Sequence, residues 1–163
     1  MIAEQSFPTE ANSLQVFLAA PRGFCAGVVR AVDIVEIALE RYGAPVYVKH
    51  EIVHNPHVVA DLEAQGAITV ETVDDIPEGS VVVFSAHGSP PEDFEAAERR
   101  SLRVIDATCP LVTRVHNEAK KYQNEGKKLI LVGHRGHQEV KGTTGQGEMA
   151  LMDDQEDPQP PDW

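Results

Sequence analysis

The chain has 163 residues, of which 42% are apolar and 25% are charged, a composition that suits a globular protein with room for one domain or for one domain plus part of another. Its formal net charge of -12 argues against a nucleic-acid partner, because phosphate backbones bind to basic surfaces. The first thirteen residues hold no Lys or Arg and no sustained apolar block, which excludes a secretory signal or a membrane span there. A cytoplasmic location is therefore the expectation.

The acidic character is concentrated near the carboxyl end. Six carboxylates follow Lys141, the last basic residue: Glu148, Asp153, Asp154, Glu156, Asp157 and Asp162. Residues 148–163 are therefore predicted to form an acidic, Pro-rich tail, and residues 1–13 to form a disordered extension. The part of the chain between them is only mildly acidic.

Strand and helix patterns alternate through the first half of the chain. The apolar run at 14–20 predicts a buried strand, and a Gly-rich turn around Cys25 follows it. Apolar residues then recur every three or four positions over 28–42, which predicts a helix that ends at Gly43. The next expected elements are a strand at 46–48, a short helix at 58–65, and strands at 68–70 and 80–84.

The second half repeats the alternation and then loses it. The expected elements are a charged helix at 92–100, a strand that begins at 104–105, a helix at 112–122 and a strand at 128–132. Beyond Gly142 several glycines break the pattern, and 149–152 is the only segment there that could form a short strand.

This alternation predicts an α/β fold, with a parallel sheet and helices on both faces. We expect a first α/β domain at 14–108 and an incomplete second α/β domain at 109–147. Ligands of such sheets gather outside the carboxyl ends of the strands. The functional residues are therefore sought at strand ends.

Both cysteines lie where a predicted strand gives way to a predicted helix. Gly23 and Gly27 flank Cys25 and allow the backbone to approach a bulky ligand, while Cys109 is followed by a proline at the start of a helix. A helix amino terminus favours the thiolate, the form that binds metals. The other interpretation is that each cysteine is a small buried apolar residue. The residues alone leave both interpretations open.

Three histidines, His54, His87 and His137, follow predicted strand ends. Imidazole is a common metal ligand and, when protonated, a good donor to phosphate oxygens, so together they predict a pocket for a metal or an anion. Solvated or capping histidines are the alternative. The remaining histidines fit a pocket less well: His50, His57, His116 and His134. His116 lies one step from the apolar stripe of its helix, which indicates a surface or supporting position.

Glu139 follows His137 by two residues, in a segment predicted to be a loop. A carboxylic acid drawn into a cleft could have a raised pKa and donate a proton. An exposed loop carboxylate is the alternative. The residues by themselves thus indicate an α/β protein with a metal or anion site.

Five segments resemble, in order and spacing, the 4-hydroxy-3-methylbut-2-enyl diphosphate reductase family. They are PRGFCAG at 21–27, HEIVHN at 50–55, FSAHG at 84–88, DATCPLVT at 106–113 and GHRGHQEVKGT at 133–143. The resemblance covers about residues 14–146. It implies the last step of the methylerythritol phosphate route to isoprenoids, in which an allylic diphosphate loses its hydroxyl by reduction to give isopentenyl and dimethylallyl diphosphate.

The resemblance also implies roles for individual residues. In that family a [4Fe-4S] cluster is held by three cysteines, and a low-potential electron donor such as ferredoxin or flavodoxin supplies the electrons. The implied assignments are Cys25 and Cys109 as cluster ligands, His54, His87 and His137 as the pocket for the diphosphate, and Glu139 as the acid that protonates the departing oxygen.

The chain also departs from the family. The family has three similar domains and a third cysteine ligand, whereas this sequence has two cysteines, and residues 153–163 do not resemble the family. The chain is therefore expected to be an amino-terminal portion of the enzyme, inactive alone. The alternative is a non-catalytic module, either one that binds diphosphate or metal by itself or a dimer that assembles a cluster from four thiols.

Overall fold

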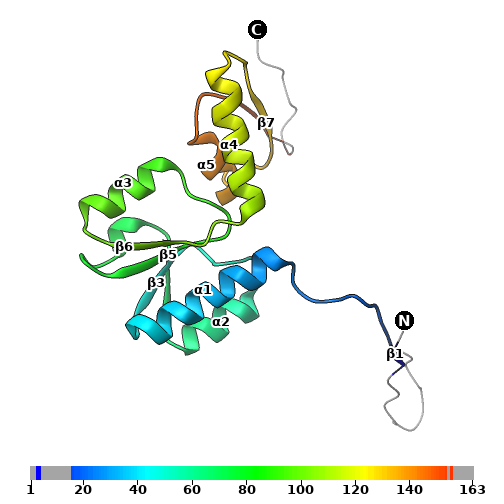
Figure 1. The fold of residues 1–163 in the computed structure, drawn as a ribbon, viewed down its shortest axis with the longest axis vertical. Helices are drawn as coiled ribbons and strands as arrows, with labels where there is room; N and C mark the ends of the chain where they lie inside the picture. The colour runs from blue at the N-terminus through cyan, green and yellow to red at the C-terminus, as the bar shows by residue number, and fades with distance from the viewer. Residues whose placement is uncertain (1–2, 5–15, 154, 156–163) are drawn as a thin grey trace.

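The structure is a computed structural model that describes residues 3–4, 16–153 and 155. Its centre is a four-stranded, all-parallel sheet with the strand order β4-β3-β5-β6 (Figure 1). The strands are β3 (Val46–Lys49), β4 (Ala67–Val70), β5 (Val81–Phe84) and β6 (Arg103–Asp106). The predicted parallel sheet is confirmed, and the four predicted strands lie within a residue or two of their expected positions.

Helices cover both faces of this sheet, as predicted. The helices α1 (Ala26–Tyr42) and α2 (Pro56–Ala64) pack on one face, and α3 (Pro91–Arg99) with the short helix η1 (Val73–Asp75) packs on the other (Figure 1). Successive strand residues point to opposite faces, so Val83 joins the first core and Phe84 the second. Both are fully buried, which explains why β5 is apolar throughout.

Helix α1 is positioned by its apolar stripe and its two caps. Ala31, Val35 and Ala38 recur at helical spacing and are fully buried against the sheet. The helix begins at Cys25, which is the N-cap, and ends at Gly43, whose positive φ of 77° lets its N–H bond to the carbonyl of Leu39. The amino end of α1 therefore places the first cysteine beside the sheet.

A second lobe follows the sheet and contains α4 (Pro110–Asn124), β7 (Ile130–Val132), α5 (Gln138–Thr144) and β8 (Ala150–Met152). β7 and β8 form a parallel pair, and α4 packs against α5 (Figure 1). β8 lies in the segment expected to be an acidic tail, where 149–152 was the possible short strand. Residues 154 and 156–163 of that tail lie outside the described residues.

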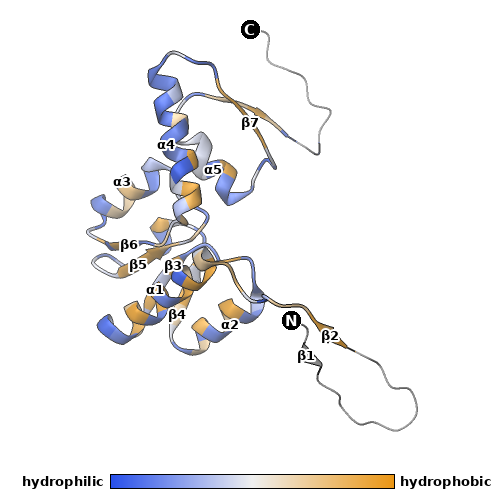
Figure 2. Ribbon diagram, turned by 45° about the vertical axis from the view of Figure 1, so that its right-hand side comes forward, coloured by the Kyte–Doolittle hydropathy of each residue, from blue (hydrophilic) through white to orange (hydrophobic). Residues whose placement is uncertain are grey.

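The prediction of a buried strand at 14–20 is wrong for the residues that the structure describes. Only Phe17–Leu18 (β2) is a strand, and it pairs antiparallel with Ala3–Glu4 (β1) instead of joining the parallel sheet. Phe17 is 63% exposed, and β2 projects from the body of the molecule (Figure 2). An apolar run shows the tendency to form a strand but does not identify its partner. Of the extension predicted at 1–13, only Ala3–Glu4 is described, and it is paired.

Among the helices in the described part of the chain, none combines the length and the apolar character needed to cross a bilayer.

Candidate functional site

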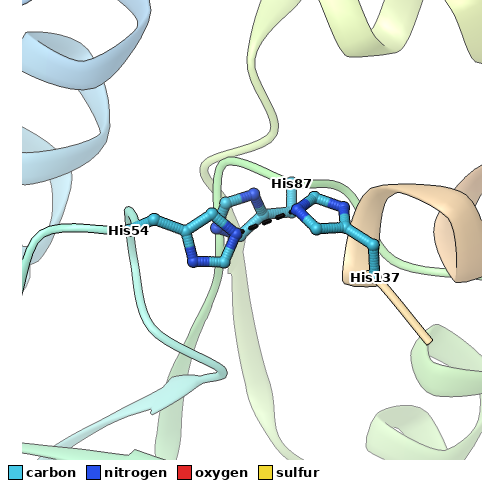
Figure 3. A group of neighbouring side chains, drawn as sticks. All are labelled: His54, His87 and His137. Carbon is cyan, nitrogen blue, oxygen red and sulfur yellow. Dashed lines mark hydrogen bonds between the residues drawn. The ribbon is translucent and has the colours of Figure 1, made fainter. Parts of the chain in front are cut away.

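Three histidines from distant parts of the chain meet at the carboxyl ends of the strands (Figure 3). His54 lies between β3 and α2, His87 follows β5, and His137 is the N-cap of α5. One ring nitrogen from each lies within 4.8 Å of the others. The ring centroids are 4.1 Å apart for His54 and His87, and 5.1 Å apart for His54 and His137. We call these three side chains the histidine cluster.

A chain of hydrogen bonds sets the tautomers in the histidine cluster. The backbone N–H of Glu139 donates to Nδ1 of His137 at 3.2 Å, so a neutral His137 carries its proton on Nε2. That Nε2 lies 3.0 Å from Nε2 of His54 and donates to it (Figure 3). The proton of His54 is then on Nδ1, which faces a carboxylate oxygen of Glu51 at 3.4 Å. His137 therefore presents an N–H donor at the centre of the cluster.

His87 is the most shielded member of the cluster. Its Nε2 is buried and has no hydrogen-bond partner among the described residues. Burial, followed by the neighbouring His54 and His137, lowers the pKa of His87 to about 4. The ring is therefore neutral at neutral pH. A buried polar atom without a partner costs roughly 1–3 kcal/mol, which a ligand that reached it would recover.

The two cysteines also meet, beside a single glycine. A Cβ atom built on Gly27 would lie 2.8 Å from Sγ of Cys109 and 3.8 Å from Sγ of Cys25, so both sulfurs border the space that a side chain would fill. Cys25 is the N-cap of α1, and Cys109 is the N-cap of α4, with Pro110 in the first helical turn. Both thiols are free, and both lie at the amino ends of helices, where the helix dipole is positive.

A backbone framework links the cysteine pair to the histidine cluster. The guanidinium of Arg30, on α1, donates to the carbonyl oxygens of Ala107 and Thr108 at 3.3 and 3.1 Å, which ties α1 to the loop before Cys109. The N–H of Cys109 then donates to the carbonyl of Ala86 at 3.0 Å, one residue before the central histidine of the cluster. The thiols and the imidazoles thus share one set of loops.

The loop after β5 is held between α4 and α5 by glycine contacts. A Cβ atom on Gly142 of α5 would lie 2.8 Å from the carbonyl oxygen of Gly88, so the two backbones touch. On the other side, a Cβ atom on Gly88 would lie 2.7 Å from Cε1 of His116 on α4. These close approaches set the distance between His87, which precedes Gly88, and His137, which caps α5.

His116 is a residue that the sequence analysis ranked low. The prediction that His116 could lie at the surface is wrong, because the side chain is buried under the loop after β5. Its Nε2 has no hydrogen-bond partner among the described residues. Burial first, and then the charge of Lys120, lower the pKa of His116 below its ordinary value. The position one step from the apolar stripe was the available signal, and it was compatible with burial at the edge of a packed face.

Glu139 lies in a helix and not in the predicted loop. It is in the first turn of α5, next to His137, and its side chain is exposed. The helix was missed because it has seven residues, includes Gly142 and shows no apolar stripe. An acidic residue two positions after an N-cap is favourable to the helix dipole, and this was the signal that could have revealed the helix.

Comparisons with known proteins give one consistent answer. The family model described as "LytB protein" matches residues 16–160. A protein of Acidothermus cellulolyticus named 4-hydroxy-3-methylbut-2-enyl diphosphate reductase is 58% identical over 146 residues, covering 88% of this chain and 43% of the relative. A Leifsonia xyli protein of the same name is 62% identical over 131 residues, covering 80% of this chain and 39% of the relative.

Solved structures agree with the sequence comparisons. The E-1-hydroxy-2-methyl-but-2-enyl-4-diphosphate reductase of Plasmodium falciparum superposes with a TM-score of 0.79 at 43% identity, covering 82% of this chain and 42% of that one. A structure of (E)-4-hydroxy-3-methyl-but-2-enyl diphosphate reductase gives a TM-score of 0.71 at 39% identity, covering 79% and 47%.

This chain thus spans less than half the length of the relatives named above. Within that span, the residues matched by the family model include both cysteines, the histidine cluster and Glu139. The chain therefore belongs to the LytB protein family.

Proposed function

We propose that this chain supplies part of the active site of a 4-hydroxy-3-methylbut-2-enyl diphosphate reductase, which reduces an allylic diphosphate with the aid of a [4Fe-4S] cluster. The observation that carries the proposal is the placement of three imidazoles and two thiols on one set of loops at the carboxyl ends of the strands. The names of the relatives support the reaction.

The histidine cluster is proposed to hold the diphosphate. The N–H on Nε2 of His137 points at His54 in the absence of a ligand, and a phosphate oxygen entering between the rings would take its place as acceptor. Nδ1 of His54 already faces the carboxylate of Glu51, which orients the ring for this contact. The buried Nε2 of His87 would gain the partner that it lacks.

Cys25 and Cys109 are proposed to be two ligands of the iron-sulfur cluster. Their sulfurs border the same space above Gly27, and thiolates are the ligands such clusters use, so the residues present fit the group. When bound, the cluster supplies single electrons and an iron that can act as a Lewis acid. The sequence holds two cysteines, so a third thiolate ligand would come from outside it. A low-potential donor such as ferredoxin or flavodoxin, and a cytoplasmic setting that keeps thiols reduced, complete the proposal.

Glu139 is proposed to donate the proton to the departing oxygen. When the allylic carbon–oxygen bond breaks, the bonding pair leaves with the oxygen, which departs as water only if a proton reaches it. Two electrons from the low-potential donor and a second proton then go to the carbon skeleton. Support comes from its position: Glu139 lies in the first turn of α5, two residues after His137, and its backbone N–H donates to Nδ1 of His137, so the residue is next to the histidine cluster. The diphosphate, once held, would orient the allylic chain toward Glu139.

A chimera tests the proposal directly. Residues 16–146 would replace the matching segment of the Acidothermus relative, and reductase turnover and cluster absorbance would be measured anaerobically. We expect an active chimera that loses its cluster with Cys25→Ser, and keeps its cluster but loses turnover with Glu139→Gln. Glu78→Gln, in an exposed turn away from both the cysteines and the histidine cluster, is the matched control. A chimera with a full cluster but no turnover would refute the proposal.

The alternative is a non-catalytic module that binds diphosphate or metal, and the presence of only two thiols favours it. Two copies could then share a cluster through four thiols. Sizing the isolated chain before and after iron removal separates the two functions, since a shared cluster requires a dimer that dissociates when iron is lost.

A further inference from the structure

We infer that His54, His87 and His137 also form a binding site for a divalent cation of the zinc class, used by this chain in the absence of diphosphate. The inference does not depend on the proposed reductase function. A metal takes the lone pairs of ring nitrogens, whereas an anion takes their N–H groups, so either idea can fail while the other stands.

The first support is the geometry of the nitrogens. Zinc binds histidine nitrogen at about 2.0–2.1 Å in a tetrahedron, which places neighbouring ligand nitrogens roughly 3.3 Å apart. The Nε2 atoms of His54 and His137 are already 3.0 Å apart, and the whole set lies within 4.8 Å. Small side-chain rotations therefore bring the three nitrogens to one ion. Three imidazoles with a fourth position left open is the coordination of many zinc enzymes.

The second support is the surroundings of the ligands. A histidine that binds a metal usually donates its other N–H to a carboxylate, which fixes the ring. Nδ1 of His54 faces Glu51 at 3.4 Å in this way. His87 contributes one ring nitrogen to the set, and its buried Nε2 has no partner among the described residues, so a metal bound at that atom would displace no existing hydrogen bond.

One contact opposes metal binding. If Nε2 of His137 binds a metal, the ring proton moves to Nδ1, and the hydrogen bond from the Glu139 backbone N–H is lost. That bond is long, at 3.2 Å, and it is exposed, whereas three metal–nitrogen bonds are gained. The balance therefore favours the metal when it is present.

The test uses the full chain with Cys25→Ser and Cys109→Ser, so that no thiol competes for metal. Zn²⁺ titrations by calorimetry should show one ion per chain, and Co²⁺ should give the visible absorption of a tetrahedral ion without thiolate charge-transfer bands. Separate His54→Ala, His87→Ala and His137→Ala changes should each lower the affinity at least tenfold. Glu51→Gln should lower it about tenfold, as expected for a second-layer carboxylate.

His57→Ala is the matched control, because His57 is exposed, lies three residues after His54 and is outside the cluster. Its affinity should match that of the parent. Nitrogen NMR shifts of the histidine rings on zinc addition give a readout that needs no variant, and they should change at His54, His87 and His137. Changes confined to His57 or His134, equal affinity in the cluster variants, or the absence of saturable binding would each overturn the inference.

Discussion

Replacing Gly142 by alanine tests whether the contact between α5 and the loop after β5 sets the geometry of the histidine cluster. The new Cβ atom would lie 2.8 Å from the carbonyl oxygen of Gly88, and its other near neighbours are also backbone atoms. Backbone cannot rotate away, so α5 must retreat by roughly 0.6 Å to reach ordinary contact. Overpacking of this kind costs about 1–3 kcal/mol of unfolding free energy.

The same displacement should be visible at His137, because that residue caps α5. If the retreat follows the line between the rings, the Nε2–Nε2 distance to His54 grows from 3.0 Å to about 3.6 Å, at which the hydrogen bond is lost. Pyrophosphate would itself replace that bond, so the relevant change is the shift of His137 by about 0.6 Å away from the positions at which all three rings reach one ligand. We expect the affinity for inorganic pyrophosphate to fall about tenfold, equivalent to about 1.4 kcal/mol.

Calorimetry with pyrophosphate and thermal unfolding would be measured on the same samples. Gly147→Ala is the control, because a Cβ atom there meets only the flexible amide end of Gln123, away from the cluster. It should leave pyrophosphate binding unchanged. If Gly142→Ala lowered the unfolding free energy as expected but bound pyrophosphate as tightly as the parent, the contact would be structural only, and the reasoning would be refuted.

Three further predictions concern pH, the framework and the thiol pair. The pKa of His87 is about 4 in the folded chain and 6.5 when unperturbed, so unfolding takes up a proton between these values, and the unfolding free energy should fall as pH drops from 6.5 to 4. Urea unfolding should show this slope in the parent and a smaller one in His87→Gln; equal slopes would contradict the assignment. Arg30→Met should lower the unfolding free energy by about 1–3 kcal/mol, because two carbonyls lose a charged donor, whereas Arg99→Met, which breaks an exposed pair, should change it by less than about 1 kcal/mol. Gly27→Ala should prevent anaerobic assembly of the iron-sulfur cluster, because its Cβ would meet Sγ of Cys109. Normal iron-sulfur absorbance in that variant would exclude the proposed cluster site above Gly27.

The sheet and most helices could be predicted because their residues carry strong local patterns. β5 is apolar at every position since both of its faces are covered, and α1 shows its stripe over four turns. β2 and α5 could not be assigned correctly for the opposite reason. β2 takes a partner, Ala3–Glu4, that no local pattern identifies, and α5 is too short for a stripe to emerge.

The site could be predicted as a set of residues but not as a geometry. Strand-end positions identified the cysteines and the histidines, and the family motifs suggested their roles. That His54 and His137 would lie 3.0 Å apart depends on how α5 packs against the loop after β5, a contact between distant segments. Likewise, the need for a glycine at position 27 depends on the sulfur of Cys109, which comes from another helix. Gly23, four residues earlier, has a positive φ and open space around it, so a glycine is needed there for the backbone conformation of the turn.

The seam between the two lobes runs through the histidine cluster, because two of its rings belong to the sheet and the third caps a helix of the second lobe. A ligand that contacts all three rings therefore also links the two lobes. The second lobe has a two-stranded sheet, and Val132 on that sheet is 67% exposed, so this lobe has the smaller core. Its stability should therefore increase more than that of the first lobe when a ligand binds. Protection of β7 from hydrogen exchange should consequently rise with ligand occupancy of the histidine cluster, because a ligand that binds only the folded form stabilises it.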